Sequence, residues 1–155
     1  KMQTKFLKTQ INEDVFMAAL KNTASMMPPK VYDMMKMLLN PGYDGEDIDD
    51  PDYVPFQDTM GNCLSTGQKT NGAVAIFYPG VARLFCDKIN TDELYLVFTS
   101  IHEVMVHNAR MIEPEDLASV LNDTIKEATP EGDVLTKHIY YYNAKTDQIE
   151  MLLRE

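Results

Sequence analysis

The chain has 155 residues, the commonest size for a single domain, and we expect one hydrophobic core spanning 1–155. Hydrophobic residues make up 45% and charged residues 25%, ordinary globular values that exclude a disordered chain. The net charge is −10 and Lys and Arg never cluster, so no surface offers the positive charge on which nucleic-acid binding depends. We therefore expect no nucleic-acid partner.

The sequence also excludes a membrane partner. No apolar run approaches the roughly 20 residues that span a bilayer, and the negative charge repels anionic lipid. Cys63 and Cys86 lack a CxxC motif or a companion histidine, which favours two free thiols in the cytoplasm. No signal peptide precedes the first expected helix, so we expect a cytoplasmic protein, although the start at Lys1-Met2 leaves open an incomplete chain. The oligomeric state stays open.

Residues 1–42 are predicted to form an antiparallel pair of helices. The first helix spans 12–22 and buries one stripe, formed by Phe16, Ala19 and Leu20. The second helix begins after Pro28-Pro29 and ends at Asn40-Pro41-Gly42. The buried stripe of the second helix consists of Val31, Met34, Met35 and Leu38.

Residues 43–57 are rich in Asp, Glu, Pro and Gly, which is typical of a solvated loop or linker. Within it, Asp47, Asp49 and Asp50 resemble the start of an EF-hand. The glycine required at the sixth position is missing and Pro51 stiffens the loop, so we expect no calcium site.

Residues 58–155 are predicted to contain the sheet. The apolar runs 73–78 and 94–99 suit central strands, and a helix over 81–89 between them makes a strand–helix–strand unit, typical of a parallel or mixed sheet. Further strands are expected at 62–66, 103–107, 138–143 and 148–153, and a helix begins at Pro114 with the stripe Leu117, Val120, Leu121 and Ile125. The predicted class is α+β: a mixed β-sheet with helices packed mainly on one face, preceded by the helical pair.

The segment His102-Glu103-Val104-Met105-Val106-His107 looks like the zinc-protease motif HExxH, but its histidines lie five positions apart. That spacing separates them by about 140° around a helix and places them on opposite faces of a strand, so they cannot share one metal. We predict no metal and no cofactor.

Two kinds of candidate site remain. His102, at the end of a strand, is a candidate general base with Ser100 and Glu103 beside it and Asn71 as an orienting group, although a histidine that satisfies a turn is the commoner situation. Ser100 also lacks the GxSxG elbow that exposes a nucleophile. The other candidate is a partner-binding methionine face made of Met26, Met27 and Met37, because flexible thioethers suit variable contacts.

Several short segments together carry a resemblance to a known family. They are Ala19-Leu20-Lys21-Asn22-Thr23, Asn71-Gly72-Ala73, Tyr78-Pro79-Gly80, Leu94-Tyr95, Ser100-Ile101-His102-Glu103-Val104, Asn122, Val134-Leu135 and His138-Ile139-Tyr140. In these the chain resembles the C-terminal half of an uncharacterised bacterial family of unknown function, DUF5688, common in gut anaerobes. Family members usually have a further N-terminal region, which implies that this chain is a fragment or a shortened relative.

The resemblance implies a fold but no activity, substrate or cofactor. The family pattern has Ser-Asp after the Val-Leu pair, where this chain has Thr136-Lys137, so any role of that aspartate is in doubt here. Two functions therefore compete. A non-catalytic protein-interaction or scaffolding module is favoured, because no chemical motif has the required spacing. The alternative is a small-molecule-binding or hydrolytic domain with a polar site around His102.

Overall fold

The computed structural model describes residues 2–152, with side chains from Glu13 to Leu152. The strands are β1 (Pro29–Tyr32), β2 (Glu46–Asp47), β3 (Asn62–Thr66), β4 (Glu93–Ser100), β5 (Glu103–Asn108), β6 (Ile139–Asn143) and β7 (Gln148–Met151). The helices are α1 (Met2–Met26), α2 (Met34–Leu39), α3 (Val81–Ile89) and α4 (Pro114–Glu127), with the 3₁₀ helices η1 (Gly72–Phe77) and η2 (Glu131–Asp133).

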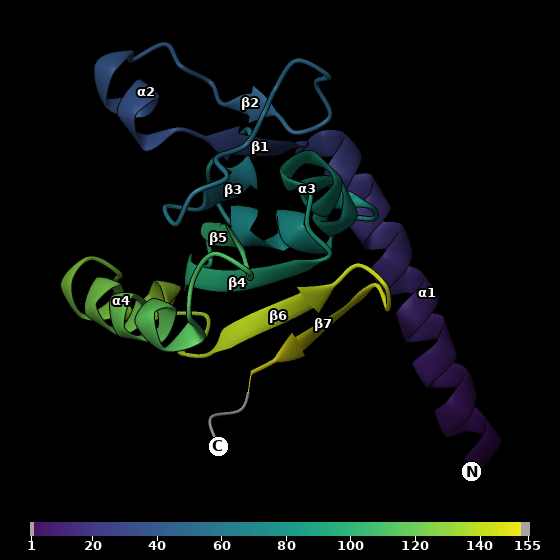
Figure 1. Ribbon diagram of the computed structural model, residues 1–155. Coiled ribbons are helices and arrows are strands. Elements are labelled where there is room, and N and C mark those ends of the chain that lie inside the picture. The colour runs from purple at the N-terminus through teal and green to yellow at the C-terminus, as the bar shows by residue number, and fades with distance from the viewer. Residues whose placement is uncertain (1, 153–155) are drawn as a thin grey trace.

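The strands form one 7-stranded sheet in the order β2-β1-β3-β5-β4-β6-β7 (Figure 1). Every neighbouring pair is antiparallel. The predicted α+β class is confirmed. The prediction of a mixed sheet is wrong, because no parallel pair occurs among the strands of residues 2–152.

Helices cover both faces of the sheet because the side chains of β4 alternate between two apolar cores. Leu94, Leu96 and Phe98 face the larger core, which includes α3, η1 and the end of α1. Val97 points to the other face and packs in a smaller core with Leu117 and other residues of α4. α1, α3 and η1 lie on one face, while α4 covers part of the second.

The apolar run 73–78 is not a strand. It forms η1, which packs on the sheet with Ala73, Ala75 and Ile76 buried. An apolar run of this length fits a buried helix as well as a buried strand, and periodicity does not separate the two. Because η1 takes the place of the first strand in the expected strand–helix–strand unit, the reason for a parallel pair disappears.

The expected helical pair does not form either. Pro29–Tyr32 is the strand β1, which runs between the end of α1 and the start of α2 (Figure 1). α1 is longer than predicted, and its side chains at residues 2–12 lie outside the described part. Leu20 is buried as expected, but Phe16 is 61% exposed.

The acidic segment 43–57 is more than a solvated loop. Glu46–Asp47 forms β2 and pairs with β1, so this segment extends the sheet. Ile48 follows directly, is 2% exposed and belongs to the larger core. Tyr53 also packs against this core and Pro55 is buried, while the carboxylates that dominate the composition lie near the surface.

The remaining elements follow the predictions closely. The strands β3 to β7 and the helices α3 and α4 lie within a few residues of their expected bounds. In α4, Leu117 and Leu121 are buried, but Val120 is 61% exposed and Ala118 is buried instead.

Candidate functional site

His102 lies in the turn between β4 and β5, and both of its ring nitrogens face polar groups of the protein. Its Nδ1 accepts a hydrogen bond from the backbone N–H of Asn71 at 3.0 Å. Its Nε2 lies 3.4 Å from Oδ2 of Asp133 in η2. Because Nδ1 is an acceptor, the neutral ring carries its proton on Nε2, facing the carboxylate. The imidazole therefore links η1, the β4–β5 turn and η2.

The backbone around this turn is packed tightly against η1 and β3. The carbonyl of His102 accepts a hydrogen bond from the Ser65 hydroxyl at 2.7 Å. Gly72 lies so close that an added β-carbon would come within 2.7 Å of that carbonyl oxygen and of the backbone nitrogen of Thr66. Only a residue without a side chain fits here without a shift of backbone.

Ser100 and Glu103 do not point at the imidazole. The Ser100 hydroxyl accepts a hydrogen bond from the backbone N–H of His102 at 3.0 Å. The Glu103 carboxylate accepts one from the Thr99 hydroxyl at 2.9 Å and one from the Cys63 thiol at 3.4 Å. Burial and this carboxylate raise the pKa of the Cys63 thiol. The structure brings Asn71 and His102 together and adds Asp133, which the sequence analysis missed.

His107 is separate from this cluster. It is 7% exposed, and among the described residues its Nδ1 has no hydrogen-bond partner. Desolvation lowers its pKa below the ordinary 6.5, offset in part by the backbone of Thr59. Within residues 13–152 no group of three or more His, Cys, Asp and Glu side chains is arranged to hold a metal ion.

Among the side chains of residues 13–152, α2 has the most exposed large apolar residues of any one element, and this helix stands beside the β1–β2 edge of the sheet (Figure 1). All six residues of this helix are exposed, and Leu38 and Leu39 are 76% and 75% exposed. We call its apolar side chains the α2 surface: Met34, Met35, Met37, Leu38 and Leu39.

The predicted methionine face is divided between two elements. Met37 belongs to the α2 surface and is 37% exposed. Met26 is 79% exposed at the end of α1, and Met27 next to it is half-buried. β1 separates these two residues from Met37. Conversely, Met34 and Met35 were expected in the core and are exposed, because α2 lies beside the edge of the sheet and buries none of its residues.

A cavity of about 510 Å³ lies between α2 and the segment that follows β2. We call it the acidic groove. Asp33 and Lys36 of α2 and Glu46 of β2 line one part of it. The remaining lining comes from Asp50, Asp52, Tyr53, Val54 and Phe56.

Hydrogen bonds fix both walls of the acidic groove. The Asp33 carboxylate caps α2 by accepting from the backbone N–H groups of Met35 and Lys36 at 2.8 and 3.1 Å. On the same wall, the Lys36 ammonium binds the Glu46 carboxylate at 2.7 Å. On the opposite wall, the Lys88 ammonium donates to the carbonyls of Asp50 and Tyr53. Specific side-chain contacts therefore hold the walls of the groove in place.

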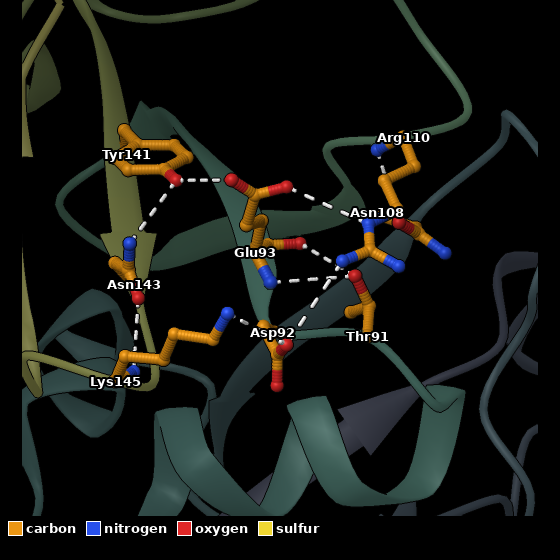
Figure 2. A network of polar contacts seen from close by, with 8 residues as sticks. All are labelled: Thr91, Asp92, Glu93, Asn108, Arg110, Tyr141, Asn143 and Lys145. Carbon is orange, nitrogen blue, oxygen red and sulfur yellow. Dashed lines mark hydrogen bonds and ion pairs between the residues drawn. The ribbon is translucent and has the colours of Figure 1, made fainter.

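A third polar cluster joins β4, β6 and the loop after β5. Figure 2 shows Glu93 between Tyr141 and Arg110. The Tyr141 hydroxyl donates to the Glu93 carboxylate at 2.6 Å, and Nε of Arg110 lies 3.5 Å from the same carboxylate. These contacts lower the pKa of Glu93 and raise that of Tyr141 to about 12. The carboxylate and the guanidinium of this cluster are paired with each other. We therefore interpret the cluster as a structural contact that connects β4 with β6 and the loop after β5.

Comparison with known proteins identifies one family. The model of the family of unknown function DUF5688 matches residues 4–144. No curated protein and no solved structure matches the chain. Among the residues that the structure describes, no helix combines the length and apolar character that crossing a bilayer requires. The match confirms the resemblance seen in the sequence, but gives no support to the expected restriction to the C-terminal half. The chain belongs to the DUF5688 family.

Proposed function

We propose that this protein is a non-catalytic interaction module that binds a protein partner through the α2 surface. The observation that carries the proposal is that five of the six residues of α2 are large and apolar while all six are exposed. Apolar surface left in water forgoes about 25 cal/mol per Å². Clustered apolar surface of this kind marks interaction sites on globular proteins.

The helix does not owe its formation to burial of that surface. An isolated helix of this length is unstable in water, and here the Asp33 cap and the Lys36–Glu46 ion pair hold it in place. The chain therefore maintains an apolar helix in an exposed position by polar contacts. This arrangement suits a surface whose apolar side chains become buried in a complex.

The alternative, a small-molecule or hydrolytic site around His102, has weaker support. Asn71, His102 and Asp133 do converge, which favours it. A general base, however, needs a free lone pair within reach of substrate, and the Nδ1 lone pair of His102 accepts the Asn71 N–H. Ser100 is turned toward the backbone. These contacts support a structural role for His102.

The buried thiols of Cys63 and Cys86 fit the cytoplasmic location expected from the sequence. A cytoplasmic partner is therefore the one to seek.

Affinity purification from the native host tests the proposal. The tagged protein is compared with the double variant Leu38→Glu/Leu39→Glu, and Val120→Glu serves as the control because Val120 is 61% exposed on α4. We expect partners of the wild type to be lost from the double variant and kept by the control. A separate variant, Met26→Gln/Met27→Gln, is expected to keep them. Unchanged partners with the double variant would refute the proposal.

A further inference from the structure

We infer that the α2 surface and the acidic groove together select a positively charged amphipathic peptide segment of the partner. The inference rests on the proposed function and names the chemistry of what binds. The apolar face of such a segment would cover α2, while its Lys or Arg side chains would enter the groove.

The charge of the groove supports this choice. Its lining holds four carboxylates and the ammonium of Lys36, which is already paired with Glu46. The Lys88 ammonium, beside the opposite wall, donates to the backbone carbonyls of Asp50 and Tyr53, so carboxylates still outnumber ammonium groups here. The Asp52 carboxylate makes no ion pair within residues 13–152. Among the same residues, the one hydrogen bond that Oδ1 of Asp50 accepts comes from the neighbouring backbone N–H of Asp52. Unpaired carboxylates beside an apolar helix are complementary to a cation on an apolar segment.

Apolar side chains continue from α2 into the groove. Val54 and Phe56 line it and are 66% and 42% exposed. A ligand that fills the groove thus meets apolar and carboxylate groups in turn. Small-molecule sites are lined mainly by apolar groups with a few polar ones, and this lining is mostly charged. A peptide helix that carries basic side chains along the border of its apolar face fits it better.

Two other occupants are disfavoured by charge. A second copy of this chain carries a net charge of −10, and its approach to the carboxylates of the groove would be repulsive. An anionic lipid surface is repelled in the same way.

An amphipathic helix that lays its apolar face on a partner is a common mode of peptide recognition and uses residues spaced three and four apart.

A defined probe tests the inference with the full chain. The probe is a fluorescein-labelled amphipathic peptide of about 18 residues, built from Leu and Lys at helical spacing. Its dissociation constant is measured by fluorescence anisotropy at about 50 mM and about 200 mM NaCl. Two peptide controls replace Lys by Glu or scramble the order of Leu and Lys. We expect the wild type to bind the probe and neither control.

Two pairs of variants separate charge from apolar contact. Asp50→Asn/Asp52→Asn keeps the Oδ1 acceptor that the Asp52 N–H uses, and should weaken binding about 5- to 20-fold at low salt with a smaller salt dependence. Asp123→Asn/Glu127→Gln removes the same charge from the exposed side of α4, and should change binding less than about 2-fold. Leu38→Ser/Leu39→Ser should weaken binding more than about 10-fold at both salt concentrations.

The outcomes distinguish the inference from the proposed function. Loss of binding with Leu38→Ser/Leu39→Ser but equal effects of the two charge variants would overturn the basic partner and leave the α2 surface standing. If neither the leucine variant nor Asp50→Asn/Asp52→Asn weakens binding, both fail. Binding of wild type to phosphatidylcholine vesicles in place of the peptide would assign the surface to lipid. A dimer in sedimentation that Leu38→Ser/Leu39→Ser dissolves would assign it to a second copy.

Discussion

The imidazole of His107 lies directly against the α-carbon of Gly61, where an added β-carbon would come within 2.5 Å of the ring. Gly61 has a φ of 73°, in the left-handed region that favours glycine. The glycine lets the chain before β3 close over the ring, which is 7% exposed on β5. The close approach therefore explains why this histidine is desolvated.

The first prediction concerns stability in mild acid. Burial lowers the pKa of His107 in the folded protein, whereas in the unfolded chain the ordinary value near 6.5 applies. The unfolded state therefore binds more protons below that pH, and the free energy of unfolding falls as the pH drops through 6.5 toward the folded pKa. Urea unfolding at pH 7.5 and 5.5 should show a smaller loss for His107→Gln than for wild type.

His138→Gln is the matched control for that experiment, because His138 is exposed at the start of β6. It should lose as much stability as the wild type between the two pH values. An equal loss for His107→Gln and wild type would contradict the assignment to His107.

A second prediction uses the close packing of Gly72. Its substitution by Ala forces a β-carbon against the Ser65 hydroxyl and two backbone atoms, so β3, η1 or the β4–β5 turn must shift. We expect Gly72→Ala to lower the free energy of unfolding by about 2 to 4 kcal/mol. Gly67→Ala serves as the control, since a β-carbon there meets nothing within 4 Å, and should change stability by less than about 0.5 kcal/mol. Equal midpoints in urea for the two variants would exclude the crowding.

The third prediction concerns the Glu93 cluster. The hydrogen bond from Tyr141 is the largest cause of the lowered pKa of Glu93, ahead of Arg110. Tyr141→Phe should therefore raise the Glu93 pKa part of the way to its ordinary value, as followed by NMR titration of the side-chain carboxyl carbon. Tyr95→Phe removes a neighbouring hydroxyl that does not bond to Glu93 and should leave the titration nearly unchanged. An unchanged Glu93 pKa in Tyr141→Phe, with a raised one in Tyr95→Phe, would assign the shift to another group.

A fourth prediction tests what holds the wall of the acidic groove. The side-chain amide of Asn62 binds both backbone groups of Phe56: Oδ1 accepts the N–H at 2.8 Å and Nδ2 donates to the carbonyl at 2.9 Å. Asn62 is 2% exposed. In Asn62→Asp the ionised carboxylate loses the donor and faces the Phe56 carbonyl, which should cost about 2 to 4 kcal/mol at pH 7.

At pH 4 the penalty should shrink, because a protonated carboxyl group can donate where the amide did. Thermal unfolding of variant and wild type at the two pH values measures this difference. Asn62→Ala has no charge, so its penalty should not vary with pH. A penalty for Asn62→Asp that stays constant would show that the carbonyl contact does not matter.

The helices and strands that were predicted correctly from the sequence have strong local signals. Pro114 at the first turn with Glu115 and Asp116 behind it marks α4, and the apolar run 94–99 marks β4. The failures occurred where local signals were ambiguous. Pro29 permits both a helix start and the first residue of a strand, and Val31-Tyr32 favours the strand β1, which the helical spacing of the later methionines obscured.

Only part of the candidate site around His102 could be predicted from the sequence. A contact between Asn71 and His102 was anticipated, but as a side-chain contact, whereas the backbone N–H of Asn71 makes it. Asp133 carried no signal, because its approach to His102 depends on the long path of the chain through α4 and η2. An exposed Met37 was expected, but the exposure of Met34, Met35 and Leu38 was missed, because an apolar helical stripe indicates burial only when another element covers it.

The two outermost strands of the sheet have a consequence for how the protein behaves among other chains. β2 has only two residues and both are carboxylates, Glu46 and Asp47. β7, at the far edge, is four residues long and includes Glu150. Short, charged borders are poor templates for an incoming strand, and natural proteins use them to prevent aggregation. The two edge strands therefore protect the unpaired backbone groups of the sheet, although apolar side chains of α2 are exposed beside β2.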